Sequence, residues 1–153
     1  MPNKSLVNIL KSDFPQINFT SGEYFKWSFD EKTIYFNPHD DDDGTYLLHE
    51  LAHAILDHRD FDLDVELVRK ESEAWDRTIV KLADKYEVDI DQNEAEMSLE
   101  SYRHWLHQRS KCPDCGTNGL QSKNTHYKCI ACGCSWRAND ARICGLKRYR
   151  VSA

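Results

Sequence analysis

The period of the hydrophobic pattern changes twice along the chain. Apolar side chains recur at helical spacing over residues 4–12, and Pro15 prevents that helix from continuing. Short segments rich in aromatic and β-branched residues come next, separated by turn-forming residues. They predict two or three short antiparallel strands: 16–20, 24–28 and 33–37. The helical period then returns and predicts three further helices: 45–58, 63–86 and 92–108.

Long periodic runs disappear near Arg109, where cysteine, glycine and basic residues become frequent. This change predicts two domains, 1–108 and 109–153, and 153 residues are enough for both. No apolar run is long enough to span a bilayer, and the N-terminus lacks the pattern of a secretory signal. We therefore expect a soluble cytoplasmic protein without membrane association, whose six cysteines bind metal rather than form disulfides.

The net charge of -6 conceals an asymmetry between the two predicted domains. From Arg109 onward there are nine Lys or Arg and two Asp, whereas the preceding 108 residues carry eleven Lys or Arg and twenty-four Asp or Glu. Such opposite balances suggest two modules with different partners, although a solvated basic surface without a partner would show the same count.

Residues 49–53 read His-Glu-Leu-Ala-His within an apolar helical segment. His49 and His53 are four residues apart, so on a helix they point the same way and can hold one Zn²⁺. Glu50 follows the first histidine, where it can take a proton from a water that the metal activates. A helix that is apolar nearly all round is buried, and it rarely carries two histidines and a glutamate inward without a purpose.

A catalytic zinc site needs a third protein ligand and an open fourth position. Leu56 and Arg59 stand where a metzincin needs Gly and His, which excludes that class. On a continued helix His58 would lie about 140° from His53, too far to share the metal. It reads instead as a surface residue or a support for a ligand.

A downstream carboxylate is the remaining choice for the third ligand. Glu71 shares the apolar face of the helix predicted over 63–86, whereas Glu73 is turned about 200° away toward charged neighbours. A carboxylate on an apolar face needs a strong partner, and a metal is one. We therefore predict Glu71 as the ligand.

At this point the chain resembles the ImmA/IrrE-type metallopeptidases. The resemblance covers about residues 1–90 and rests on His-Glu-Leu-Ala-His-Ala-Ile-Leu-Asp-His at 49–58 and Glu-Ser-Glu-Ala-Trp at 71–75, with Ile-Tyr-Phe-Asn at 34–37 as the edge strand before the helix. It implies a cytoplasmic peptidase in which His49, His53 and Glu71 bind zinc and Glu50 is the base. Some members cleave repressors.

The sequence departs from related enzymes at Trp75, where many have an Asp or Asn that steadies a zinc-bound histidine. The sequence therefore does not decide which group steadies the zinc-bound histidine here, and the candidates are Asp76, Asp57 or a backbone carbonyl.

Cys112-Pro-Asp-Cys115-Gly and Cys129-Ile-Ala-Cys132-Gly are two knuckles separated by thirteen residues. Four thiolates at this spacing predict a closed tetrahedral zinc site of structural type, and the metal would supply much of the folding energy of so small a module. Cys134 competes with Cys132 as a ligand, although Gly133 favours Cys132. Cys134 and Cys144 otherwise read as ordinary thiols.

Together these features predict an α+β chain. A minimal zincin-like domain over 1–108, with a small antiparallel sheet, an active-site helix and two further helices, would precede a four-cysteine zinc ribbon over 109–153. Basic and aromatic residues of the ribbon suit either nucleic acid or an acidic protein. The candidates for that contact are Lys128, Trp136, Arg137, Lys147 and Arg148. Trp136 also suits the core of the ribbon.

The leading hypothesis is an intracellular zinc endopeptidase that cleaves a protein substrate, of which a repressor or other regulatory protein is one class. The substrate would lie extended against the strand at 33–37. The oxyanion donor stays open among Tyr46, Tyr102, His104 and His107.

Two alternatives remain. A SprT-like protease of DNA-bound proteins would explain the basic ribbon, but it needs a further His that is missing between His58 and His104. A nucleic-acid-binding regulator on a non-catalytic zincin scaffold has no need of Glu50.

Overall fold

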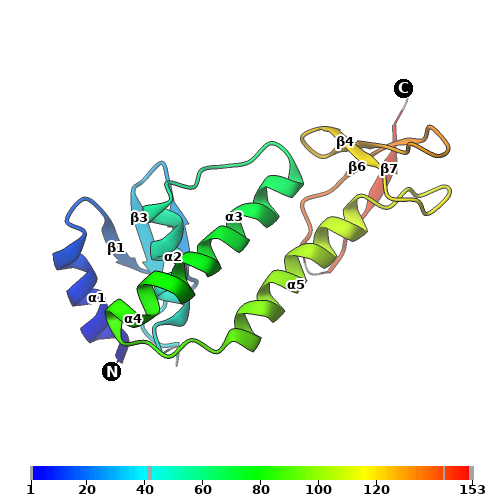
Figure 1. Cartoon of the computed structure of the whole chain (residues 1–153). Coiled ribbons are helices and arrows are strands. Elements are labelled where there is room, and N and C mark those ends of the chain that lie inside the picture. The colour runs from blue at the N-terminus through cyan, green and yellow to red at the C-terminus, as the bar shows by residue number, and fades with distance from the viewer. Residues whose placement is uncertain (1, 41–42, 143, 152–153) are drawn as a thin grey trace. The chain divides into compact units, whose positions relative to one another are not determined.

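The structure is a computed structural model that describes residues 2–40, 43–142 and 144–151. It is an α+β chain with two small sheets and a cluster of four cysteines in its C-terminal part (Figure 1). The chain divides into two compact units, one of residues 1–60 and 70–95 and the other of residues 61–69 and 96–153. In the described part of the chain, no helix is long and apolar enough to cross a membrane.

The sheet of the first unit corrects two predictions. Its strands are β1 (Asn18–Ser21), β2 (Lys26–Ser28) and β3 (Thr33–Phe36). Their order is β1-β3-β2, with β1 parallel to β3 and β2 antiparallel to it, so the expected all-antiparallel arrangement is wrong. The segment expected as an edge strand, β3, lies in the centre. Its Thr33, Ile34 and Phe36 are buried, as suits a strand covered on both faces.

Helix α2 (Thr45–Ile55) forms the centre of the first unit and packs against β2 and β3 (Figure 1). Four apolar side chains of α2 are fully buried: Leu47, Leu48, Leu51 and Ala52. They share one hydrophobic core with residues of α1 (Pro2–Asp13) and β3. Gly44 precedes the helix with a φ of 109°, and a Cβ there would lie 2.7 Å from Leu6 Cδ2. Only glycine meets both conditions, so α2 begins close against α1.

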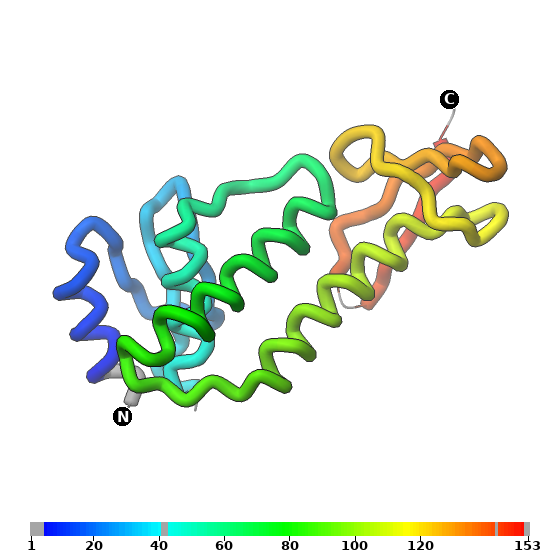
Figure 2. Tube along the Cα trace, viewed as in Figure 1, coloured from blue at the N-terminus to red at the C-terminus, as the bar shows by residue number. Residues whose placement is uncertain are grey.

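The segment predicted as one helix over 63–86 contains three consecutive helical parts (Figure 2). They are α3 (Asp64–Arg77), a π-helical turn η1 (Thr78–Leu82) and α4 (Ala83–Tyr86). Thr78 is fully buried, and its hydroxyl donates to Ala74 O at 2.7 Å. A hydroxyl bonded back to the preceding turn perturbs helical pairing, and the π turn begins at this residue. Helix α5 (Gln92–Arg109) matches the prediction for 92–108.

The second unit is built on an antiparallel sheet in the order β4-β5-β6-β7. Its strands are β4 (Leu120–Lys123), β5 (His126–Lys128), β6 (Ser135–Ala138) and β7 (Arg148–Arg150). Tyr127 and Trp136 stack at 5.7 Å in its core. A Cβ on Gly119 would lie 2.6 Å from the Trp136 ring and 2.5 Å from Lys128 O, so glycine is required at this position before β4.

Residues before 109 also belong to this unit, which includes residues 61–69 and 96–108. Asp64 at the start of α3 is 1% exposed, and Arg109 Nε donates to its carboxylate at 2.8 Å. The Tyr127 hydroxyl donates to the same carboxylate. The predicted domain boundary at residue 109 implies that residues 109–153 fold on their own, and this stays a prediction.

Candidate metal centres

Helix α2 places His49 and His53 one turn apart on its buried side. Their exposed fractions are 4% and 8%, and their rings meet edge to face with centroids 4.6 Å apart. The two Nε2 atoms lie 3.1 Å from each other. The i, i+4 spacing therefore directs two imidazole nitrogens to one point inside the first unit.

Glu71, from the second half of α3, reaches the same point. Its carboxylate lies 2.8 Å from His49 Nε2 and 3.2 Å from His53 Nε2, one oxygen facing each ring. Burial raises the pKa of Glu71, but the hydrogen bonds from His49 and His53 outweigh burial and hold that pKa well below its usual value. The carboxylate is thus kept ionised against two imidazoles.

These three side chains fit a tetrahedral metal. Ligand atoms about 2.0–2.1 Å from a tetrahedral zinc lie roughly 3.3 Å from one another. The nitrogen and oxygen atoms of His49, His53 and Glu71 are 2.8 to 3.2 Å apart, close to that spacing. His49, Glu50 and His53 also offer donor atoms that lie within 4.8 Å of one another. Of the two carboxylates, Glu71 fits the ligand position better, because it contacts both imidazoles.

Glu50 lies beside this group, and its Oε2 accepts a hydrogen bond from the Trp27 backbone N–H at 2.8 Å. Trp27 is on β2, so the strand at the edge of the sheet approaches the histidines. Burial raises the pKa of Glu50, and the neighbouring His53 and His49 oppose that rise. A carboxylate whose pKa is shifted upward is a better proton acceptor and donor near neutral pH.

Glu73 does not join Glu71. It lies 3.1 Å from His58 Nε2, and His58 Nδ1 in turn lies 2.8 Å from His53 Nδ1. The side chain of His58 is 10% exposed, so His58 is a partly buried support of His53 rather than a fully exposed surface residue. Burial lowers the pKa of His58 more than Glu73 raises it.

His58 therefore occupies the supporting position for which the sequence left Asp57, Asp76 and a backbone carbonyl as candidates. Asp57 pairs instead with Lys32 and Arg59 at the surface.

Trp75 supports the other histidine by stacking. Its ring is 4.1 Å from the His49 ring with an interplanar angle of 26°, and it is 1% exposed. His49 Nδ1 is buried and has no hydrogen-bond partner among the described residues. Trp75 thus holds the His49 ring by its face rather than by a hydrogen bond.

Of the four candidate oxyanion donors, Tyr46 belongs to the first unit, as do His49, His53 and Glu71. Its ring contacts Trp75 edge to face at 6.0 Å, and its hydroxyl donates to Glu94 at 2.8 Å. The other three belong to the second unit: Tyr102, His104 and His107. There the Tyr102 hydroxyl accepts from Arg142 at 2.8 Å.

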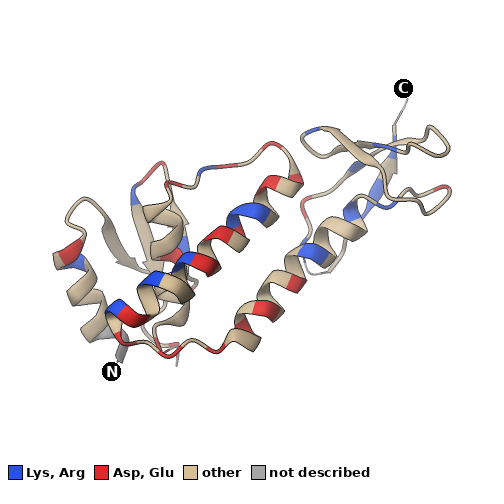
Figure 3. Cartoon of the chain, in the orientation of Figure 1, with Lys and Arg blue, Asp and Glu red and all other residues tan. Residues whose placement is uncertain are grey.

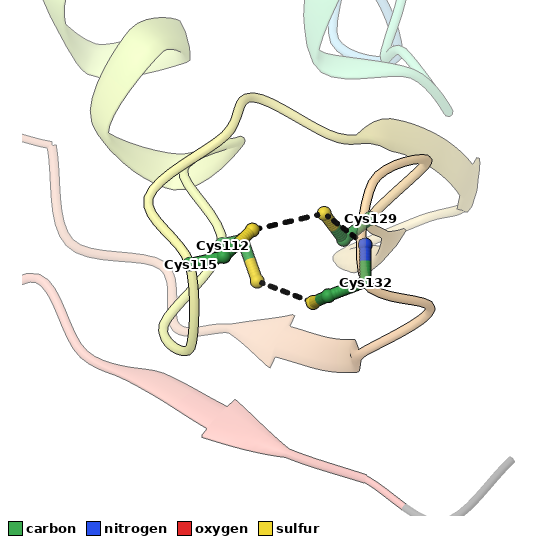
Figure 4. A group of neighbouring side chains, drawn as sticks. All are labelled: Cys112, Cys115, Cys129 and Cys132. Carbon is green, nitrogen blue, oxygen red and sulfur yellow. Dashed lines mark hydrogen bonds between the residues drawn. The ribbon is translucent and has the colours of Figure 1, made fainter.

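The four predicted cysteines converge in the second unit (Figure 4). The Sγ atoms of Cys112 and Cys132 are 3.6 Å apart, and those of Cys115 and Cys129 are 3.5 Å apart. Thiolates at about 2.3 Å from a tetrahedral zinc lie roughly 3.8 Å apart, so the group fits a closed four-thiolate site.

Two further observations support a thiolate site. Backbone N–H groups donate to the sulfurs at the knuckles: Asp114 N to Cys112 Sγ, and Ala131 N and Cys132 N to Cys129 Sγ. Hydrogen bonds from Thr117 lower the pKa of Cys115 to about 6. The group that could hold a metal includes Cys132, as the glycine after it suggested, and does not include Cys134.

Figure 3 marks Lys and Arg positions on the second half of α5 and on β7. Lys128, Arg137 and Lys147 are exposed, and the Arg137 guanidinium lies 4.9 Å from the Tyr149 ring. Arg148 is partly buried and donates to Lys111 O.

Trp136 corrects the predicted contact surface. It is fully buried, and its indole N–H donates to Arg109 O at 2.9 Å. It packs the core and cannot stack on a partner.

Comparison of the chain with protein-family models, with curated proteins and with solved structures finds no match. A functional hypothesis for this protein therefore rests on its own two groups of side chains that could hold a metal. One group combines two histidines with the carboxylate of Glu50, and the other consists of four cysteines.

Proposed function

We propose that the chain is a zinc-dependent peptidase of the ImmA/IrrE type, with a minimal zincin-like catalytic domain and a structural zinc in its C-terminal ribbon. The observation that carries the proposal is the convergence of His49, His53 and Glu71 on one point, with Glu50 beside it. Two His and one carboxylate are a ligand set of catalytic zinc, because they leave a position open. Reduced thiols at the four-cysteine site suit a cytoplasmic protein.

When bound, a zinc ion supplies Lewis-acid polarisation of a carbonyl and lowers the pKa of a water molecule. Glu50 accepts the proton of the attacking water and passes it to the leaving amine. The Trp27 N–H holds the Glu50 carboxylate in place for both transfers. Glu71 and the two imidazoles would hold the metal through their lone pairs, so they would carry no proton in this reaction.

Strand β2 is the natural platform for the substrate. It lies at the edge of the sheet, and the Trp27 N–H is directed to Glu50 instead of to β3. An extended peptide that lies along this edge strand would bring its carbonyl groups past Glu50. The edge at β2 therefore replaces the strand at 33–37, which lies inside the sheet.

Metal analysis and one substitution test the proposal. We expect two zinc ions in the full chain, one for each group of side chains. Glu50→Gln should keep both ions and lose peptide hydrolysis. Its expression in the native host should trap a protein that the wild-type chain cleaves. Equal cleavage by the wild-type and Glu50→Gln chains would refute the mechanism.

The same capture separates the rival functions. The proposed substrate is a protein, such as a repressor or another regulatory protein. Recovery of nucleic acid alone would favour a regulator that uses the exposed basic residues Lys128, Arg137 and Lys147. A SprT-like enzyme would need a third histidine at the metal, and Glu71 fills the corresponding position in the first unit.

A further inference from the structure

Three side chains behind the proposed metal position form a continuous line of contacts that begins at His53. His53 Nδ1 lies 2.8 Å from His58 Nδ1, and His58 Nε2 lies 3.1 Å from Glu73 Oε2. The rings of the two histidines meet at 62° with centroids 5.0 Å apart. His53 is thus held on the side opposite to Glu71.

The end of α2 explains why His58 folds back on His53. The Asp57 N–H donates to Ala54 O at 3.1 Å, and the His58 N–H donates to His53 O at 3.0 Å. Asp57 has a φ of 57°, in the left-handed region. These bonds are those of a Schellman motif, which brings the second residue after the helix onto its last turn. An apolar contact usually accompanies the motif, and a contact between two imidazoles takes its place here.

The direction of each hydrogen bond follows from the donor inventory. An ionised carboxylate only accepts, so His58 Nε2–H donates to Glu73. His58 Nδ1 of the neutral ring is then an acceptor, and His53 Nδ1–H must donate to it. With Nδ1 protonated, a neutral His53 would present an unprotonated Nε2 to a bound metal, and this is the atom that lies 3.2 Å from Glu71 and 3.1 Å from His49 Nε2.

His49 has no comparable arrangement. It stacks on Trp75, and its Nδ1 has no hydrogen-bond partner among the described residues. Stacking orients a ring but does not decide which nitrogen carries the proton. The hydrogen-bonded line therefore gives His53 a fixed tautomer that His49 lacks.

We propose that His58 and Glu73 are positioning residues that fix His53 as an Nε2 ligand and so strengthen metal binding without touching the metal. The inference rests on the proposed metal site. Helix α3 would then act on His53 from two sides, with Glu71 facing Nε2 and Glu73 supporting Nδ1 through His58. Two glutamates two residues apart thereby serve different purposes.

Metal titration of the full-length chain tests this without reference to peptidase activity. Co²⁺ bound to thiolates gives charge-transfer absorption that nitrogen and oxygen ligands do not, so the cysteine site is an internal reference. Zn²⁺ dissociation constants follow from competition with a chelator. The variants are His58→Ala, His58→Asn, Glu73→Ala and the control Asp76→Ala, which removes an exposed carboxylate from the same helix.

Loss of a side chain that supports a ligand typically weakens metal binding about 10- to 100-fold. We expect this loss at the histidine site in His58→Ala and Glu73→Ala, with the cysteine site and Asp76→Ala unchanged. His58→Asn should lose less, because its amide oxygen can replace Nδ1 as acceptor for His53 but cannot reach Glu73. Circular dichroism checks the fold, and Glu73→Ala decides if His58→Ala unfolds, because Glu73 is 48% exposed.

Dissociation constants within about twofold of wild type in His58→Ala and Glu73→Ala would overturn the inference. If the wild-type chain binds two metal ions while these variants are unaffected, the inference fails and the proposed metal site stands. If the wild-type chain binds metal only at the cysteines, both fail together.

Discussion

At the scale of single residues, Glu71 and Glu73 show how helical phase separates two identical side chains. Glu71 is 7% exposed and contacts both imidazoles, whereas Glu73 contacts His58. A rotation of about 100° per residue places residues two apart on different sides of a helix. The phase of the apolar stripe was therefore sufficient to predict which glutamate faces the two histidines, and the role of Glu71 as a ligand stays a prediction.

Replacement of Glu71 tests its proposed role. Glu71→Ala should weaken metal binding at the histidine site by more than about 100-fold, because loss of a ligand exceeds loss of a supporting residue. The loss of metal affinity in Glu73→Ala should be smaller than about 100-fold. Zinc content after dialysis against a chelator distinguishes them, and retention of the ion by Glu71→Ala would exclude Glu71 as a ligand.

A second residue with a predictable effect is Tyr127, which donates to the buried Asp64. Burial and this hydrogen bond raise the pKa of Tyr127 above its ordinary value of about 10. A group whose pKa is higher in the folded than in the unfolded protein stabilises the fold fully at pH values below its unfolded-state pKa. That contribution is lost as the pH rises toward its folded-state pKa.

We therefore expect the free energy of unfolding of the zinc-loaded chain to fall above about pH 10, and to fall less in Tyr127→Phe. Denaturant titrations on both sides of that pH measure the slope. Tyr24→Phe is the control because Tyr24 is 77% exposed. Equal slopes for the wild-type and Tyr127→Phe chains would show that the phenol does not contribute.

At the scale of elements, the end of α2 decides the surroundings of His53. A helix continued to residue 58 would carry His58 to another face, but α2 ends at Ile55. The left-handed Asp57 then reverses the chain. Such a conformation costs most L-residues roughly 1–2 kcal/mol and costs glycine little.

Substitutions of Asp57 separate the effect of its left-handed backbone conformation from the effect of its side-chain charge. Asp57→Gly and Asp57→Asn should leave zinc affinity near the wild-type value, because both residues tolerate this backbone and the ion pairs of Asp57 are exposed. Asp57→Val should destabilise the chain by about 1–2 kcal/mol and weaken zinc binding at the histidine site. Urea denaturation and chelator competition provide the two measurements. Unchanged zinc binding in Asp57→Val would mean that His58 does not depend on this turn.

At the scale of the whole molecule, the two compact units share helices rather than dividing at a single point in the sequence. Helices α3 and α5 each contribute residues to both units. The first residues of α3 belong with the cysteine sheet, where the ion pair of Asp64 and Arg109 is buried. The four cysteines are therefore not the only group of residues that could stabilise that sheet.

Asp64→Ala measures this second support. It leaves the Arg109 charge buried and unpaired, which typically costs about 3–5 kcal/mol. Asp114→Ala is the matched control, since the ion pair of Asp114 with Arg150 is exposed and such pairs contribute less than about 1 kcal/mol. Denaturant unfolding of the zinc-loaded chain compares the two. Similar small losses would show that the ion pair of Asp64 and Arg109 does not stabilise the second unit.

Local patterns were sufficient for much of this molecule. The helical period located α2, α5 and the consecutive helical segments that begin with α3. The i, i+4 and CxxC spacings identified the two groups that could hold metal. These features depend on residues close in sequence, or on the phase of one helix, so the chain itself specifies them.

Tertiary structure decided what depends on long-range pairing. Strand order placed β3 inside the sheet and left β2 beside Glu50, because two short strands can each pair with β3 and sequence does not rank the pairings. Burial assigned Trp136 to the core. The contact of His53 with His58 and Glu73 required both a helix end and a second helix, so only the folded chain joins them.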